Sequence, residues 1–151
     1  MKANEIMVGD YLCVNRDGIC TLKGTIVRVS EIDSENTFRE KRLKGSVRCE
    51  TMDGTWLSGG VWCDYLDPIS LTPKILEKNG FEKQGFDGWL LVKPMGNDLA
   101  WQILWRTDFS SPYLTIYSYS SQTGNFSSVV SYVHQLQHAL RLCQIDKEIM
   151  I

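Results

Sequence analysis

Residues 66–81, LDPISLTPKILEKNGF, contain the point at which the pattern of the chain changes. Before it, apolar residues alternate in short runs broken by Gly, Asp and Asn, which is typical of strands and tight turns. After it, helix signals begin: Thr72 is a suitable N-cap, Pro73 fits the first helical position, and Asn79-Gly80 is a C-terminal stop. The sequence therefore predicts two domains, residues 1–67 and residues 68–151.

The first domain is predicted to be a small β barrel-like domain. Its expected strands are Asp10–Val14, Thr21–Val29, Leu43–Thr51, Thr55–Leu57 and Val61–Leu66. Closure of short strands into a barrel removes exposed edges. Because Gly9-Asp10 followed by an alternating strand is similar to the opening of many SH3-like barrels, that barrel is one form we expect. The charged stretch from Ser30 to Lys44 is predicted to be a solvated loop or hairpin tip.

The second domain is predicted to be an α+β unit of one helix, a three-stranded antiparallel meander and a C-terminal helix. The expected strands are Trp89–Lys93, Leu99–Thr107 and Tyr113–Tyr119. The last helix is expected to start at a Ser127-Ser128 N-cap region and to bury an apolar stripe. The members of the stripe are Val129, Val133, Leu136, Leu140 and Cys143. Gln135, His138 and Arg141 are expected to point outward or toward an interface.

Composition and charge argue against several classes of protein: general nucleic-acid binders, membrane proteins and disulfide-linked secreted proteins. The chain has 151 residues and a formal net charge of −2, which gives no general polycationic footprint for nucleic acid. No stretch approaches the length of a membrane helix, and the N-terminus shows no apolar signal region, so we expect a cytoplasmic protein without membrane contact. The five cysteines include no CxxC pair, and we expect free, mostly buried thiols.

No catalytic or cofactor motif is recognisable. His134 and His138 are spaced so that both could reach one metal ion, but Gln135 stands where a zincin helix carries its general base. A Cys-His nucleophilic pair has no local signature, and Ser58-Gly59-Gly60 lacks the spacing of a phosphate loop. We therefore expect a protein that is not an enzyme and that holds no cofactor or metal.

Aromatic residues give the clearest indication of a binding surface. In the third expected strand of the second domain, Tyr113, Tyr117 and Tyr119 share one face, opposite Leu114 and Ile116. Helices cover only one face of a single sheet, so the tyrosine face either packs on the first domain or meets a partner. We expect that a partner would be another protein.

A second candidate partner is nucleic acid. A basic segment lies near the middle of the first domain, formed by Arg39, Lys41, Arg42, Lys44 and Arg48. Together with exposed aromatic rings, such a cluster could hold a single strand by charge and stacking. The oligomeric state stays open.

Residues 66–81 and 132–140, the latter reading YVHQLQHAL, resemble segments of uncharacterised small proteins of phage and mobile elements in gut bacteria. No activity is assigned to that group, and the resemblance carries over no site residues. It implies an accessory protein of a phage or mobile element. Taken with the residues, it favours a non-enzymatic protein-binding accessory module, with a nucleic-acid-binding accessory protein as the alternative.

Overall fold

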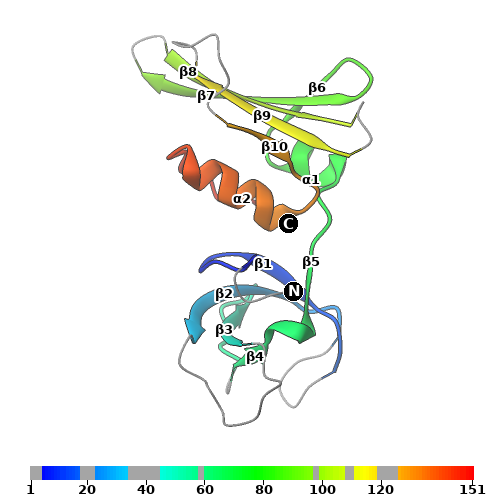
Figure 1. Cartoon of the computed structure of the whole chain (residues 1–151), viewed down its shortest axis with the longest axis vertical. Helices are drawn as coiled ribbons and strands as arrows, with labels where there is room; N and C mark the ends of the chain where they lie inside the picture. Colours follow the sequence, from blue (N-terminus) through cyan, green and yellow to red (C-terminus); the bar gives the residue numbers. More distant parts are fainter. Residues whose placement is uncertain are drawn as a thin grey trace. The chain divides into compact units, whose positions relative to one another are not determined.

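The chain divides into two compact units, Met1–Ile69 and Ser70–Ile151. The computed structural model describes residues 5–17, 23–33, 45–57, 60–96, 99–107, 111–118 and 126–151. Each unit carries one antiparallel sheet, and the described helices are few and short (Figure 1). The protein is therefore of the α+β class, as the sequence predicts.

The first unit, which we call the N-terminal unit, is built on a five-stranded sheet. Its strands are β1 (Tyr11–Val14), β2 (Ile26–Asp33), β3 (Ser46–Thr51), β4 (Val61–Trp62) and β5 (Leu66–Pro68). The order is β4-β3-β2-β1-β5, so the last strand returns to pair with the first. Because β4 and β5 remain the two edges, the sheet is open and the predicted SH3-like barrel is not confirmed.

The Gly9-Asp10 pair fixes the entry to β1. Gly9 has φ +87°, which a side chain would strain, and its N–H donates to the Val29 carbonyl at 2.6 Å. Asp10 is fully buried and accepts a hydrogen bond from the Met7 N–H at 2.7 Å. The buried aliphatic side chains of β1, β2 and β3, such as Leu12 and Val27, form the core below this turn.

Several strand boundaries in this unit differ from the prediction, and β2 begins only at Ile26. β2 continues through Asp33 with a register irregularity between Val29 and Glu31, so Ser30 to Asp33 of the predicted loop are strand, and residues 34–44 lie outside the described residues. Only an isolated bridge, Glu50↔Trp56, replaces the expected strand at 55–57. The expected strand at 61–66 is divided by a 3-10 turn over residues 63–65 because its two ends pair with different strands, β3 and β1.

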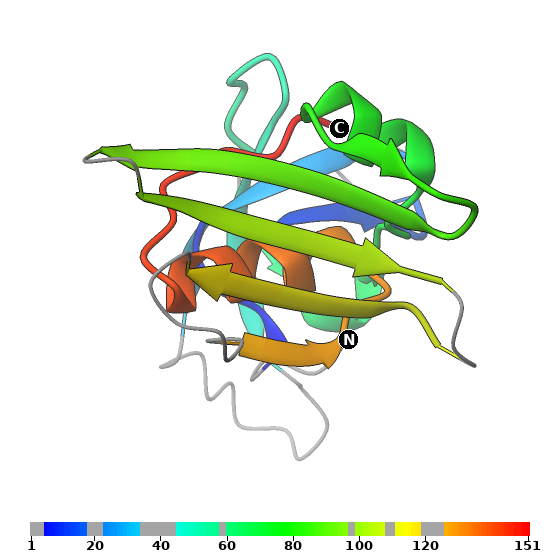
Figure 2. The same cartoon turned by 90° about the horizontal axis from the view of Figure 1, so that it is seen from above.

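The second unit, which we call the C-terminal unit, also has a five-stranded sheet. Its elements are α1 (Pro73–Lys78), β6 (Glu82–Gln84), β7 (Gly88–Gly96), β8 (Leu99–Arg106), β9 (Tyr113–Ser118), β10 (Phe126–Val129) and α2 (Val133–Leu142). The strands follow one another in chain order, β10-β9-β8-β7-β6. Figure 2 looks onto the sheet and shows α1 and α2 behind it, on one face only.

The three-stranded meander of the prediction is thus a five-stranded one. β6 is exposed at every position and β10 at three of four, so neither has the alternation that marks a half-buried strand. Ser127 and Ser128 lie in β10 and do not cap α2. Val129, which we placed in the buried stripe of the helix, is 49% exposed in the same strand.

The helix α2 begins four residues later than predicted. Tyr132 is its N-cap residue, and the Gln135 side-chain oxygen accepts the N–H of Ser131 at 2.9 Å and that of Tyr132 at 3.2 Å. From there the predicted stripe holds in part: Val133, Leu136 and Leu140 are fully buried, whereas Cys143 is the half-buried C-cap residue. The side chains on the inner face of the sheet, Ile103, Trp105, Leu114 and Ile116, are buried as well. Gln135 therefore caps the helix and is not a surface contact.

The helix α1 is confirmed at both ends. The Thr72 hydroxyl accepts the Ile75 N–H at 3.4 Å, Pro73 starts the helix, and Gly80 takes a positive φ of 78° after the last turn. Leu76 is fully buried, whereas Ile75 is only partly so. Within the described part of the chain, neither helix has the length and apolar character needed to cross a membrane.

Candidate binding surfaces

The sheet of the C-terminal unit has a face that its own helices leave open. Cross-strand pairing places one set of side chains on this face: Glu82, Gln84, Leu90, Val92, Gln102, Leu104, Arg106, Tyr113, Thr115, Tyr117, Ser127 and Val129. We call this set the outer sheet face. Neighbouring residues of the same strands, such as Ile103, Trp105 and Leu114, point to the opposite side and are at most 2% exposed.

The outer sheet face exposes apolar side chains on β7 and β10 and is aromatic along β9. Val92 is 50% exposed and Val129 49%, while Tyr113 and Tyr117 are half-buried. The Ser127 hydroxyl donates to the Tyr113 hydroxyl at 2.9 Å, which orients that ring. Glu82 and Arg106 are the charged residues among the described members of this face. The structure thus places Tyr113 and Tyr117 on one surface, and Tyr119 lies outside the described residues.

Sequence reasoning identified the tyrosines of this face but not its aliphatic residues on β7. The signal for Leu90 and Val92 is weak because they alternate with Trp89 and Leu91 in a run that is apolar throughout. Periodicity cannot separate two faces when both carry apolar residues. Only the pairing of β7 with β8, which aligns Leu90 with Leu104 and Val92 with Gln102, shows which side each residue takes.

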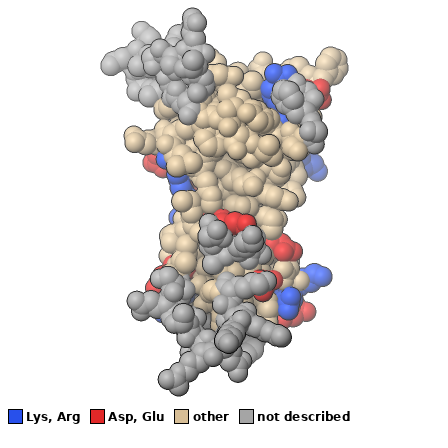
Figure 3. Space-filling view, in the orientation of Figure 1, with Lys and Arg blue, Asp and Glu red and all other residues tan. Residues whose placement is uncertain are grey.

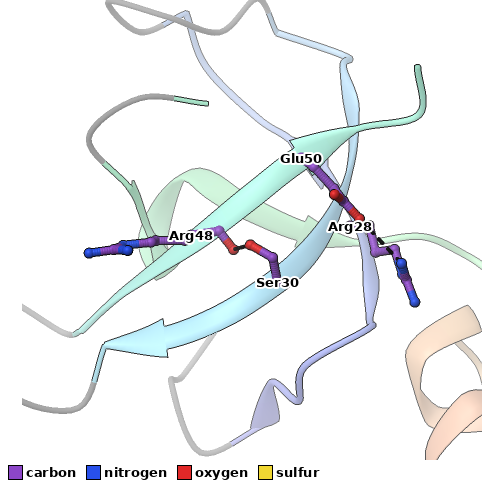
Figure 4. A network of polar contacts seen from close by, with 4 residues as sticks. All are labelled: Arg28, Ser30, Arg48 and Glu50. Carbon is purple, nitrogen blue, oxygen red and sulfur yellow. Dashed lines mark hydrogen bonds and ion pairs between the residues drawn. The ribbon is translucent and has the colours of Figure 1, made fainter. Parts of the chain in front are cut away.

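The N-terminal unit presents a different, polar surface on β2 and β3. Arg28 pairs with Glu50 across the strands at 3.2 Å, and Arg48 pairs with Glu31 at 3.0 Å. The Ser30 hydroxyl donates to the Arg48 carbonyl at 2.9 Å, and the Arg48 side chain extends away from the Arg28–Glu50 pair (Figure 4). Each arginine is matched by a glutamate, so this surface carries little net charge.

The basic segment of the sequence prediction is described only at its end. Arg39, Lys41, Arg42 and Lys44 lie outside the described residues, whereas Arg48 is exposed and ion-paired with Glu31. Trp56 is 63% exposed and bridges to Glu50, so an aromatic ring does lie beside the Arg28–Glu50 pair. This surface therefore carries an exposed aromatic residue beside charged ones, but its described arginines are already ion-paired with glutamates.

The two histidines are arranged for packing. His134 is only 5% exposed and stacks on Tyr132, with ring centroids 5.8 Å apart, while His138 meets its edge at 5.6 Å. In the described part of the chain, no three His, Cys, Asp or Glu side chains gather where they could hold a metal ion. Two imidazoles alone fall short of the three or four ligands of a zinc site.

A shallow depression of about 650 Å³ lies between the start of β2 and the turn after β3 in the N-terminal unit. Asp53 is its charged lining residue, and its carboxylate accepts hydrogen bonds from the Thr51 hydroxyl and from the Thr55 N–H. These bonds hold the pKa of Asp53 below its usual value. The carboxylate organises the turn, which leaves the depression without an evident acid or base for catalysis.

The described cysteines are free thiols, and three of them, Cys49, Cys63 and Cys143, lie in settings that raise their pKa. Cys49 and Cys63 are fully buried, and Cys13 and Cys143 are partly buried. Burial, reinforced by the neighbouring Cys63, raises the pKa of Cys49 to about 12. Burial also raises the pKa of Cys63 and of Cys143. A protonated thiol is a poor nucleophile, so these groups are suited to packing and not to covalent chemistry.

The raised pKa of Cys49 predicts that the folded chain loses free energy of unfolding at alkaline pH. The unfolded state ionises its thiol at the ordinary pKa near 9, whereas the folded state holds the proton to about 12. The stabilising contribution is therefore complete below 9 and is lost as the pH rises toward 12, with a slope of at most about 1.4 kcal/mol per pH unit. Urea unfolding across that range should show a steeper decline for wild type than for Cys49→Ala. Equal slopes would contradict the prediction.

The side of the C-terminal unit seen in Figure 3 shows its Lys, Arg, Asp and Glu side chains at the margins of a broad surface of other residues. The outer sheet face also carries few charged side chains, unlike the surface of the N-terminal unit with its two ion pairs.

Comparison with models of known protein families, with curated protein sequences and with solved structures found no match to this chain.

Proposed function

We propose that this chain is a non-enzymatic protein-binding module that acts through the outer sheet face. The observation that carries the proposal is the exposure of apolar side chains on a sheet whose opposite face is filled by its helices. Val92 and Val129 are each about half exposed, and Tyr113 lies opposite Val129 on the neighbouring strand. A sheet face that exposes apolar side chains and tyrosines to solvent is typical of a protein interaction site.

The chemistry of the face favours a protein over a charged ligand. Tyrosine gives large contact area at a low cost in side-chain entropy and keeps a hydroxyl for hydrogen bonding. Glu82 and Arg106 are the charged groups that a partner would have to desolvate among the described members of the face. Burying few charges keeps the desolvation penalty small, which suits a moderately apolar protein partner.

Two further predictions from the sequence, the barrel architecture of the N-terminal unit and the origin of the chain in a phage or mobile element, belong to the same proposal. The return of β5 to pair with β1 is a step toward the closure of a small SH3-like barrel, and we propose that architecture for the N-terminal unit. The resemblance of residues 66–81 and 132–140 supports an accessory role in a phage or mobile element, in the cytoplasm of the cell that carries it.

Nucleic-acid binding is the second candidate function, and the residues that favour it lie in the N-terminal unit. Arg28, Arg48 and the exposed ring of Trp56 lie on neighbouring positions of β2, β3 and the following bridge. The ion pairs with Glu50 and Glu31 reduce the positive potential that phosphate contacts need. This surface therefore supports nucleic-acid binding less well than the outer sheet face supports protein binding.

A pull-down with a matched pair of variants tests the proposal. Val92→Glu puts a charge on the outer sheet face at a position that is 50% exposed, and Met52→Glu makes the same kind of change at 55% exposure in the N-terminal unit. Tagged wild type, incubated with nuclease-treated lysate of cells that carry the gene, should retain a specific protein identified by mass spectrometry. Val92→Glu should reduce its recovery about tenfold or more, because an unpaired charge at an interface is costly.

Met52→Glu should recover that protein as wild type does, and both variants should keep the far-ultraviolet circular dichroism of the folded chain. Equal recovery by Val92→Glu and wild type would refute the outer sheet face as the binding surface. If nuclease removes every partner, and recovery of nucleic acid without nuclease falls steeply with salt, the second candidate replaces the first.

A further inference from the structure

We infer that the open edge of β10 takes up an extended, uncharged peptide segment of a partner protein as an added antiparallel strand. This inference rests on the proposed function and deepens it, because Ser127 and Val129 of β10 also belong to the outer sheet face. Figure 2 shows β10 at one edge of the sheet of the C-terminal unit. The backbone groups of that edge carry the inference.

Two residues of β10 direct their backbone groups away from β9. The Val130 N–H donates to the Pro112 carbonyl at 3.0 Å, in the same register as the β9–β10 pairs. Hydrogen-bonded pairs alternate along an antiparallel ladder, so Ser128 bonds to β9, whereas the N–H and C=O groups of Ser127 and Val129 face outward. Within the described part of the chain, no residue bonds to these outward groups. A further strand would satisfy them.

The other described sheet edges carry features that hinder strand addition. Charges, proline and short length are the usual protections of an edge. β6 bears Glu82 and Lys83, β5 ends on Pro68, and β4 is only two residues long. β10 has the sequence Phe-Ser-Ser-Val, without charge or proline, and pairs with β9 in unbroken register. It is therefore the edge on which a strand adds at the lowest cost.

Both faces of the sheet leave room beside β10 for the side chains of an added strand. Ser127 and Val129 are exposed on the outer sheet face. Ser128 is exposed on the opposite face, although its neighbour on β9, Leu114, is fully buried there. Because β10 offers no counter-charge, the segment that fits is uncharged and rich in β-branched or aromatic residues, which stabilise cross-strand pairs.

The small size of the edge favours a peptide over a second copy of this chain. Four residues of strand are about 14 Å long, and a sheet with its side chains is about 10 Å thick, so the edge presents about 140 Å². Two folded chains joined edge to edge would fall far short of the roughly 800 Å² per partner of a stable interface. A flexible segment gains affinity from main-chain hydrogen bonds and lays its side chains over both faces. We expect a dissociation constant of about 10–100 µM.

A multivalently displayed library of random eight-residue peptides, panned on the full chain, is the probe. Enriched peptides, made synthetically and titrated by NMR, should shift the amide signals of Ser127 and Val129 most. Ser127→Pro removes an outward N–H but no bond to β9, and should weaken binding about tenfold or more. Ser127→Ala keeps that N–H and loses only the hydroxyl bonded to Tyr113, so it should bind as wild type does.

The decisive arm uses wild-type protein and modified peptides, so it does not depend on the folding of a variant. Only every second residue of an added strand directs its N–H toward β10. N-methylation of those residues should weaken binding about tenfold or more, whereas N-methylation of the intervening residues should leave it unchanged. A library without enriched peptides, or equal effects of the two methylation patterns, would overturn the inference. So would a dimer in sedimentation that Ser127→Pro abolishes, because a second copy would then occupy the edge.

The pull-down separates this inference from the proposed function. If Val92→Glu loses a retained protein but the library gives no edge-dependent peptide, strand addition is wrong and the binding function stands. If peptides bind with the alternating methylation pattern while no protein is retained through Val92, the edge site stands and the outer sheet face is wrong as the binding surface. If neither occurs, both are wrong.

Discussion

Leu136→Ala should lower the free energy of unfolding of the C-terminal unit by about 2–5 kcal/mol. Leu136 is fully buried on α2 and belongs to the core between that helix and the sheet. Truncation removes its transfer free energy and leaves a cavity that the surrounding strands can close only in part. Because residues 70–151 form a compact unit with its own core, the loss should be confined to them.

Hydrogen exchange resolved by peptide, in increasing urea, measures this effect for each unit separately. The matched control is Leu142→Ala, the same change six residues along the same helix, where the side chain is 71% exposed. That variant should lose less than about 0.5 kcal/mol. Similar losses for the two variants, or an equal loss of protection in residues 5–57, would contradict the described core.

Asn79→Ala should destabilise the same unit by about 2–4 kcal/mol and release the segment after α2. The buried Asn79 amide donates to the carbonyls of Ile75 and Met150, both at 2.7 Å, and its side-chain oxygen accepts the Met150 N–H at 2.8 Å. Alanine makes none of these bonds and leaves the partly buried backbone groups of Met150 without that partner. Ile149, fully buried beside them, would lose its anchor.

Limited proteolysis and hydrogen exchange over residues 144–151 report this release directly. Asn79→Asp keeps an acceptor for the Met150 N–H but sets a buried carboxylate oxygen against the two carbonyls, so its loss should be at least as large as that of Asn79→Ala. Lys78→Met, which removes the adjacent donation to the Ile151 carbonyl from an exposed side chain, should have a smaller effect. Wild-type protection of residues 144–151 in Asn79→Ala would show that Ile145 and Ile149 hold the segment without it.

The sequence predicted correctly those elements whose bounds or faces depend on residues close to one another in the chain. Thr72, Pro73 and Gly80 each act within one helical turn, so the bounds of α1 could be read directly. The alternation of Leu114 and Ile116 with the tyrosines of β9 needed only the two-residue period of a strand. The α+β class and the tyrosine side of the outer sheet face follow from these signals.

Contacts between residues distant in the sequence decided the rest. β6 and β10 exist because β7 and β9 offer free edges for pairing, a cause that their own polar residues do not show. The strand at 61–66 is divided because its ends find different partners, and Ser127-Ser128 pair with β9 before any helix can start. The sequence by itself determined the local turns, caps and alternation. Only the tertiary structure decided the strand partners, and with them the joining of Leu90, Leu104, Glu82 and Arg106 into one surface, because register is a property of two strands and not of one.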